Sequence, residues 1–316
     1  MKKCPCCQSL QTKRNGIRHG RQLYKCTHCG YQFRTTNRIS LDELWERYLE
    51  HKQTISELAA YYQVSASTIK RRLSEVQQVW EQPLLEQAGF VHIDATYWGR
   101  GAGILLAIDH HTARPLYLEF IRNECAQDYR RALESISRRG YIIRGVVVDG
   151  TRTLFSLSLN IPVQMCQYHM RQIISRHLTK RPKLLASRDL LLLIDSLSNQ
   201  TYEGFNQAFQ AWKSKWHDTI MRRSLLKSGK SRYRHRKLRS AIHSIEFYLP
   251  YLFTYQQAQC IGMPNTNNKI EGTFSALKRK INCHSGMSAA NRQRLICGFF
   301  LAWKASLCNV KQEPAI

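Results

Sequence analysis

The sequence contains few acidic residues for its length. Its 316 residues include 22 Asp and Glu against 48 Lys and Arg, which gives a formal net charge of +26. Residues 1–41 contain nine Lys or Arg and no acid, and residues 222–239 contain nine more, again with no acid. This excess is more than an enzyme of small molecules needs, and it indicates a polyanionic partner. We therefore expect the chain to bind nucleic acid.

Long apolar runs are also absent. The chain passes from Met1 into polar, cysteine-bearing sequence without the apolar stretch of a signal peptide. The apolar run 190–194 is bracketed by Asp189 and Asp195, and it is far shorter than the ~18 residues that a membrane helix requires. We expect a cytoplasmic protein with no membrane partner.

Only four of the eleven cysteines fall into paired short spacings, so a disulfide framework explains them poorly. The pairs form the pattern C-x2-C-x18-C-x2-C at Cys4, Cys7, Cys26 and Cys29. Two such pairs deliver the four thiolates that tetrahedral Zn²⁺ prefers. Cys6 could replace Cys7, but its C-x-C spacing fits a metal knuckle less well. Because free thiols would leave residues 1–40 without a core, we expect a zinc ribbon there.

The next segment, residues 41–82, has apolar residues at helical spacing. The pattern is typical of a helix-turn-helix domain, and a plain three-helix connector is the alternative. Thr54 and Glu57 fit a capping box at the start of the middle helix. The third helix offers donors for phosphates and base edges, namely Ser67, Thr68, Lys70, Arg71 and Arg72.

A second kind of domain begins near residue 88. Apolar strands alternate with helical segments in the order β-β-β-α-β-α-β, in which an antiparallel edge joins a parallel core. The order predicts an α/β (α+β) fold with a ribonuclease-H-like core over 88–169 and 265–308. Residues 170–264 have an almost wholly helical pattern and form a predicted insertion domain. We expect a helix over 151–159 within the core.

Three acids are placed to carry chemistry. Asp94 and Asp149 each end an apolar strand, where rigid backbone presents a side chain outside the core. Glu271 lies in the first turn of a predicted helix and is the only acid between Glu246 and Glu313. A strand-end Asp is often a turn former, and an N-terminal Glu often complements the helix dipole. Together, however, the acids suit Mg²⁺ or Mn²⁺.

Several motifs resemble those of bacterial insertion-sequence transposases related to the eukaryotic Mutator elements. The resemblance covers about Phe90 to Lys304 and rests on residues 92–97, 147–150, 166–169, 178–183 and 266–272, with sequences HIDATY, VVDG, CQYH, LTKRPK and TNNKIEG. It implies a DDE catalytic core of Asp94, Asp149 and Glu271 with a helical insertion after the second Asp. It also implies double-stranded DNA partners, the terminal inverted repeats and the target. We expect a homodimer or higher homo-oligomer on DNA, in the nucleoid of a bacterial cytoplasm.

Cys166 and His169 form the C-x2-H pattern that accompanies the second Asp in this family. A lone C-x2-H cannot complete a structural zinc site. We favour a positioning role near the catalytic acids over metal ligation. Asp109, followed by two His, could also bind metal, but a role in the hairpin is the favoured interpretation.

Two basic clusters follow the second Asp. One lies within 222–239, where charge runs usually form a solvated face, but its aromatic neighbours suit backbone tracking and stacking on DNA ends. The other lies on the helix of Glu271, where it would place phosphate contacts beside the metals. The expected contacts are Arg232, Arg234, Arg236, Lys237, Lys278, Arg279 and Lys280.

The expected reaction is DNA cleavage followed by attack of the freed 3′-OH on target DNA, served by one two-metal site. A host-adopted regulator that uses only the zinc ribbon and helix-turn-helix is one alternative, but it leaves the residues after Phe90 unexplained. A ribonuclease-H-like nuclease or resolvase without strand transfer is the other, because it would use the same acids.

Overall fold

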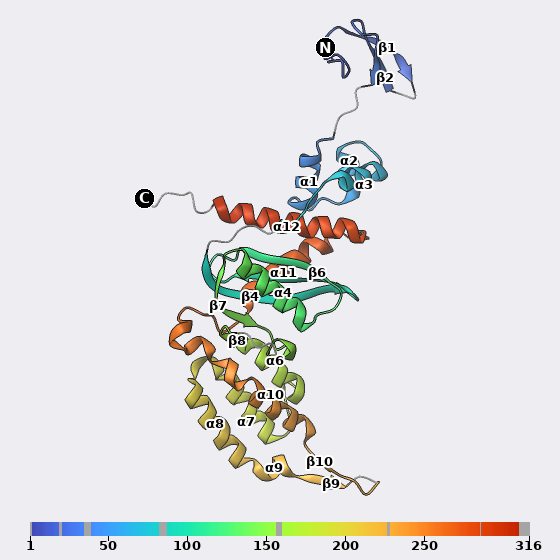
Figure 1. Cartoon of the computed structure of the whole chain (residues 1–316). Coiled ribbons are helices and arrows are strands. Elements are labelled where there is room, and N and C mark those ends of the chain that lie inside the picture. Colours follow the sequence, from blue (N-terminus) through green and yellow to red (C-terminus); the bar gives the residue numbers. More distant parts are fainter. Residues whose placement is uncertain are drawn as a thin grey trace. The chain divides into compact units, whose positions relative to one another are not determined.

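The computed structural model describes residues 2–18, 21–34, 39–81, 87–155, 160–225, 228–284 and 286–309. Its contacts define two compact units, Met1–Gln77 and Gln78–Ile316, within which Figure 1 labels the elements. None of the described helices is long and apolar enough to cross a membrane. The finer division into four domains stays a prediction.

The first unit begins with a small antiparallel sheet of β1 (Thr12–Arg18), β2 (Arg21–Cys26) and β3 (Gln32–Arg34), in that order. Its core is little more than Cys4, Cys26 and Phe33, with Tyr24 stacked on Phe33 at 5.9 Å. So small a core leaves the fold dependent on a cross-link or a bound metal.

The four paired cysteines converge beside this sheet. The Sγ atoms of Cys4 and Cys29 are 3.6 Å apart, as are those of Cys7 and Cys26, and all four lie within 4.8 Å of one another. Zn–S bonds of ~2.3 Å in a tetrahedron would place the sulfurs about 3.8 Å apart, so the donor set fits Zn²⁺. The predicted convergence is confirmed, and Cys6 lies outside the cluster, exposed.

Helices α1 (Leu41–Leu49), α2 (Ile55–Tyr61) and α3 (Ala66–Glu75) follow in the same unit. Thr54 and Glu57 form the predicted capping box at the start of α2. Leu44, Leu58, Ile69 and Leu73, which share the inner faces of these helices, are buried. This is the arrangement that the apolar spacing predicts.

The second unit is built on a sheet that, in the described part of the chain, has five strands. They are β4 (Ala88–Gly99), β5 (Ala102–Asp109), β6 (Pro115–Ile121), β7 (Ile142–Val148) and β8 (Val163–Met165). Their order is β6-β5-β4-β7-β8, with β4 to β6 antiparallel and β7 and β8 parallel to β4. This mixed α/β sheet has the predicted ribonuclease-H-like order.

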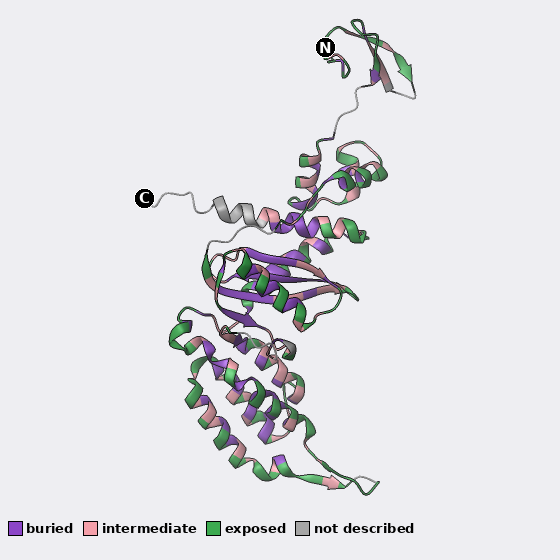
Figure 2. Cartoon of the chain, in the orientation of Figure 1, coloured by how far each residue is buried: buried purple, intermediate pink, exposed green. Residues whose placement is uncertain are grey.

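Helices cover both faces of this sheet. Val91 and Ile93 of β4 pack with Tyr129 and Leu133 of α4 (Ala126–Arg138) on one face. The alternate residues of β4 face α11 (Asn268–Asn282), which contacts that strand and is followed by α12 (Ala289–Asn309). Figure 2 shows the central strands as buried. Because side chains alternate along a strand, the α11 face receives the even-numbered residues of β4.

The helix expected over 151–159 is shorter in the described residues. It is α5 (Arg152–Phe155), and positions 156–159 lie outside the described part of the chain.

The insertion is largely helical. Helices α6 (Gln167–Leu178), α7 (Leu185–Asp195), α8 (Tyr202–Lys215) and α10 (Arg236–Leu252) share one apolar core, to which Ile174, Leu190, Phe209 and Ile245 contribute. The short α9 (His217–Met221) and the 3₁₀ turns η1 (Leu197–Asn199), η2 (Thr254–Gln256) and η3 (Ala258–Cys260) connect these parts.

The expectation of an almost wholly helical insertion is wrong at the basic run. There, β9 (Arg223–Leu225) and β10 (Ser231–Tyr233) form an antiparallel hairpin. Tyr233 pairs across the strands with Arg223, whose guanidinium lies 4.5 Å from the ring centroid, and the guanidinium of Arg239 lies 3.7 Å away. A continuous helix over this run would set like charges such as Arg232 and Arg236 four residues apart on one face, where they repel. In the hairpin, Arg223 instead lies against the Tyr233 ring, which Arg239 of α10 also contacts.

Changing Cys4 or Cys26 to Ser should remove about one Zn²⁺ per chain, because thiolate ligation supplies the folding energy of a segment with so small a core. Metal analysis of reduced, unchelated protein measures this. The matched control is Cys6→Ser, which should keep the metal because Cys6 lies outside the cluster. Zinc-free wild type, or equal loss in the control, would contradict the assignment.

Candidate active site

The strand register places the first two predicted acids beside each other. In the parallel pair β4–β7, His92 lies opposite Val147. Asp94 and Asp149 each follow two residues later, so they lie level on neighbouring strands and on the same face. Asp149 follows the end of β7, and its Oδ1 accepts a hydrogen bond from Thr151 N–H at 3.0 Å.

Asp94 lies in an environment that disfavours its charge. Burial raises the pKa of Asp94 well above its ordinary value, and the negative charges of Asp149, Glu124 and Glu271 raise it further. The hydrogen bond from Ala95 N–H, at 2.8 Å, opposes the shift. Asp149 and Glu271 are therefore both within electrostatic reach of Asp94.

Glu124 is an acid that the sequence analysis did not single out. It lies between β6 and α4 and accepts a hydrogen bond from the hydroxyl of the fully buried Tyr129. Burial, followed by the charge of Glu124, raises the pKa of Tyr129, and Asp149 and Asp94 add to the shift. Glu124 lies in a turn with no periodic pattern, so nothing in the sequence distinguishes it from surface acids.

A close approach of backbone and side chain fixes the segment after Asp149. A Cβ on Gly150 would lie 2.5 Å from Cδ1 of Ile173 on α6, so a larger residue here would require the tip of Ile173 to shift. The Gly150 carbonyl also accepts a hydrogen bond from the Tyr248 hydroxyl on α10. The insertion helices thereby fix the position of the second Asp.

Asn267, the residue before α11, joins three distant parts of the chain. Its Oδ1 lies 2.7 Å from His92 Nδ1 on β4, and its backbone N–H donates to Cys166 Sγ at 3.2 Å. Both Asn267 and Cys166 are fully buried. These contacts hold the start of α11 over β4, one helical turn before Glu271.

The two side-chain contacts of His92 are compatible with a neutral ring. Burial lowers the pKa of His92 to about 4, so the imidazole is uncharged at neutral pH. Nδ1–H then donates to Asn267, and Nε2 accepts from Nδ1–H of His110 at 2.9 Å. The first residue of the HIDATY motif thus orients α11.

Glu271 lies close to Cys166 and His169, the two residues of the C-x2-H pattern. The Sγ of Cys166, Nδ1 of His169 and Oε1 of Glu271 all lie within 4.8 Å of one another, with His169 and Glu271 3.5 Å apart. The latter two atoms are buried and make no hydrogen bond to a described residue. Among the described residues, the tight ligand groups do not include Asp94, Asp149 and Glu271 together.

The C-x2-H pattern has two interpretations, positioning of Glu271 and metal ligation. Burial raises the pKa of the Cys166 thiol, whereas a bound cation would lower it. The sulfur already accepts the N–H of Asn267. The positioning role of Cys166 and His169 stays a prediction.

Asp109 has the hairpin role that the sequence favours. Its Oδ1 accepts from the backbone N–H and hydroxyl of Thr112 at 2.6 and 2.7 Å, and its Oδ2 accepts from the Tyr141 hydroxyl. Burial raises the pKa of Asp109, but the hydrogen bonds from Tyr141 and Thr112 outweigh it, so the pKa is lowered.

The residues of α3 that are predicted to contact DNA differ in their exposure and in whether they form ion pairs. Ser67, Lys70 and Arg71 are exposed, whereas Arg72 is half-buried. Arg71 and Arg72 both pair with Glu75, at 3.1 and 2.6 Å. Thr68 is also half-buried, and its hydroxyl lies 3.0 Å from that of Ser65, the residue that caps the helix.

In the second unit, most of the side chains that are predicted to contact DNA are exposed. Lys280 is the exception, because it is half-buried with its ammonium 5.7 Å from the Phe299 ring centroid. The exposed ones are Arg232 on β10, Arg234 after it, Arg236 and Lys237 at the start of α10, and Lys278 and Arg279 on α11.

No family model and no curated protein matches this sequence. Among solved structures, the Drosophila P element transposase strand transfer complex aligns with 89% of this chain and 95% of its own, at 11% identity and a TM-score of 0.38. The HTLV-2 integrase catalytic core domain in complex with magnesium aligns with 48% of this chain and 98% of its own, at 18% identity and a TM-score of 0.21. Scores this low carry no argument, so the fold assignment rests on the strand order.

Asp109→Asn should lower the free energy of unfolding at pH 7 by about 1–3 kcal/mol, because buried donors lose a charged acceptor. Since the folded-state pKa is lowered, the contribution of the carboxylate is present above its unfolded pKa and is lost as pH falls. Urea unfolding of both proteins should show a difference that shrinks below about pH 4. A constant difference would contradict the hydrogen-bonded carboxylate.

Asp94→Asn should raise the melting temperature at neutral pH in magnesium-free buffer. The raised folded-state pKa means that wild-type stability is highest below the unfolded pKa and falls as pH rises through the folded one. The measurement is thermal unfolding between pH 5 and pH 8, about the range in which buried carboxyl groups with raised pKa values titrate. The control is Asp218→Asn, at a fully exposed side chain. Plots of melting temperature against pH that run parallel for wild type and Asp94→Asn would contradict the raised pKa of Asp94.

Proposed function

We propose that the protein is a metal-dependent DNA transposase that cleaves DNA and joins the freed 3′-OH to a target. The observation that carries this proposal is the parallel pairing of β4 with β7, which brings Asp94 of β4 near Asp149 just after β7, with Glu271 on a helix anchored to β4 through Asn267. A ribonuclease-H-like sheet order surrounds these acids. The proposal includes a bacterial insertion-sequence origin, inverted-repeat substrates and a homo-oligomer on DNA.

The acids suit Mg²⁺ or Mn²⁺. The pKa of Asp94 is raised by its burial and by the carboxylates around it, and a bound divalent cation would relieve that unfavourable concentration of negative charge. Asp94, Asp149 and Glu271 offer the hard oxygen ligands that these ions prefer. When bound, a pair of such ions supplies activation of an attacking oxygen and stabilisation of a leaving one.

The rest of the site positions these acids. Nδ1 of His169 lies 3.5 Å from Oε1 of the Glu271 carboxylate. Asn267 holds the start of α11 through His92 and Cys166, and Gly150 lets α6 approach the backbone after Asp149. These contacts keep the two aspartates and the glutamate on elements whose places are set by buried hydrogen bonds.

Basic segments supply DNA binding in this proposal. The exposed Lys70 and Arg71 of α3 suit contacts to DNA from a helix-turn-helix. Arg236 and Lys237 occupy the first turn of α10, where the helix dipole disfavours cations. Phosphate binding there would relieve the repulsion, which supports a DNA contact beside the basic hairpin.

Asp94→Ala, Asp149→Ala and Glu271→Gln should each lower plasmid cleavage and strand transfer by at least about a hundredfold, because metal ligands contribute several kcal/mol to the transition state. DNA binding, measured by fluorescence anisotropy, should stay near wild type because separate basic residues provide it. The cleavage assay uses supercoiled plasmid with the inverted repeats that flank the coding sequence.

The matched control is Asp109→Asn, an acid at a strand end that serves the hairpin and should retain activity. Cys166→Ser should reduce activity without abolishing it, because a hydroxyl can still accept from Asn267. An inactive Asp109→Asn together with an active Asp149→Ala would refute the second ligand. Cleaved but never joined products would instead identify a nuclease without strand transfer.

A further inference from the structure

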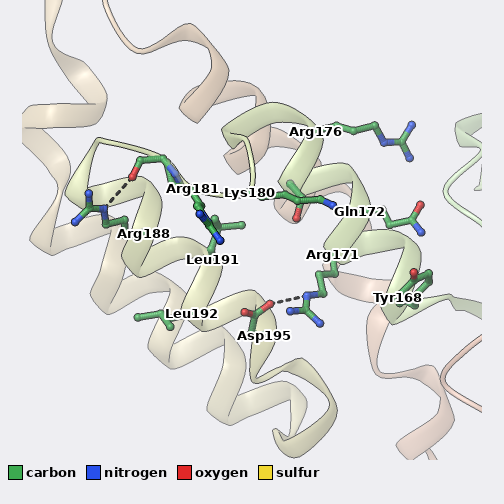
Figure 3. Close-up of a pocket in the computed structure, with 12 residues that line it drawn as sticks. Tyr168, Arg171, Gln172, Arg176, Lys180, Arg181, Arg188, Leu191, Leu192 and Asp195 are labelled. Atoms are coloured by element: carbon green, nitrogen blue, oxygen red, sulfur yellow. Dashed lines mark hydrogen bonds and ion pairs between the residues drawn. The ribbon is translucent and has the colours of Figure 1, made fainter.

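The motif LTKRPK has no role in the site described above, yet it borders a large groove of the insertion domain. The groove, of about 1110 Å³, lies between α6 and α7. Figure 3 shows Tyr168, Gln172 and Arg176 along α6 on one side, with Arg188, Leu191 and Leu192 of α7 on the other. Residues 168, 172 and 176 recur every four positions, so they share one face of α6.

The groove is strongly cationic. Its described lining includes five Lys or Arg side chains and one acid, Asp195. Asp195 is engaged by Arg171 at 2.7 Å. The remaining cations are exposed, and Arg176, Lys180 and Arg181 make no hydrogen bond or ion pair with a described residue. Three such cations along the lining of one groove suit an anion with several charges in a row.

Strained backbone presents two of these cations. Thr179, the residue before Lys180 and Arg181, has φ +70° and ψ 164°. That conformation is essentially restricted to glycine and is costly for a β-branched residue. Strain of this kind persists where the surroundings enforce it, and it is concentrated at functional sites. Here it turns the chain at the end of α6 so that the two cations line the groove.

The groove also has apolar surface and begins beside the candidate active site. Tyr168 is 44% exposed and Leu192 69% exposed, so both offer apolar surface to a ligand. Tyr168 adjoins His169, with their rings 6.1 Å apart and nearly perpendicular. An exposed aromatic ring next to cations is the combination that binds unpaired nucleotides, because bases stack while phosphates meet charge.

We propose that this groove binds an unpaired DNA strand at the cleavage site, with phosphates on Arg176, Lys180 and Arg181 and a base stacked on Tyr168. The inference rests on the proposed function and extends it. A DNA strand fits better than an acidic peptide because a peptide carboxylate would use the cations but leave the aromatic ring without a stacking partner. The strand would run from His169 along α6.

The test measures binding by the full-length protein to a labelled single-stranded oligonucleotide and to the matching duplex. In the variant Arg176→Gln/Lys180→Gln/Arg181→Gln, the log–log salt slope for the single strand should fall by about 2, since each phosphate contact contributes about 0.7. Tyr168→Ala should weaken single-strand binding about tenfold, as stacking on an aromatic side chain implies. Duplex affinity should change little in both variants.

The matched control is Arg130→Gln/Arg138→Gln/Arg144→Gln, which removes the same charge from exposed positions outside the groove. An equal effect of both triple variants would overturn the proposal, because it would reflect net charge alone. So would a poly-glutamate peptide that binds the groove as tightly as DNA and is insensitive to Tyr168→Ala. Groove-dependent binding by a wild type that cleaves no DNA would refute the proposed function and leave the groove assignment standing.

Discussion

The hydrogen bonds of Asn267 are the constraint on which the rest of the site depends. One buried side chain contacts His92 on the central strand, and its backbone contacts Cys166 at the start of the insertion. These two contacts join residues that are 175 and 101 positions apart in the sequence. Buried polar contacts of this kind are costly to leave unmade, so they fix one arrangement of the strand, the insertion and α11. That arrangement sets the position of Glu271 on α11.

The helices of residues 167–252 therefore support the segment after Asp149, one of the proposed catalytic acids. Tyr248 of α10 donates to the Gly150 carbonyl, and Gln164 and Gln167 both donate to the Leu252 carbonyl at the end of α10. These bonds connect the segment after Asp149 to a helical core that also includes Met165 of β8. A mutation in that helical core could thus alter the acids without touching them.

Electrostatics connects the site with its proposed ligands. Acids are scarce in this chain, yet three of them, Asp149, Glu124 and Glu271, raise the pKa of Asp94. Cations dominate the hairpin, the start of α10 and the groove between α6 and α7. Concentrated negative charge suits divalent ions, whereas the surrounding positive charge suits a phosphate backbone. The separation of the two signs supports one molecule that holds both metals and DNA.

The sequence by itself determined the sheet order, the cysteine cluster and the caps of the helix-turn-helix, because each depends on local spacing that the chain displays directly. It also marked Asp94, Asp149 and Glu271, whose roles stay proposals. Only the tertiary structure decided the hairpin at Tyr233, which depends on a cross-strand ring contact, and the place of Glu124, which lies in a turn without pattern. It alone brought Asn267 to His92 and Cys166 and opened the groove beside Lys180. Those contacts join residues far apart in the chain, and periodicity carries no information about them.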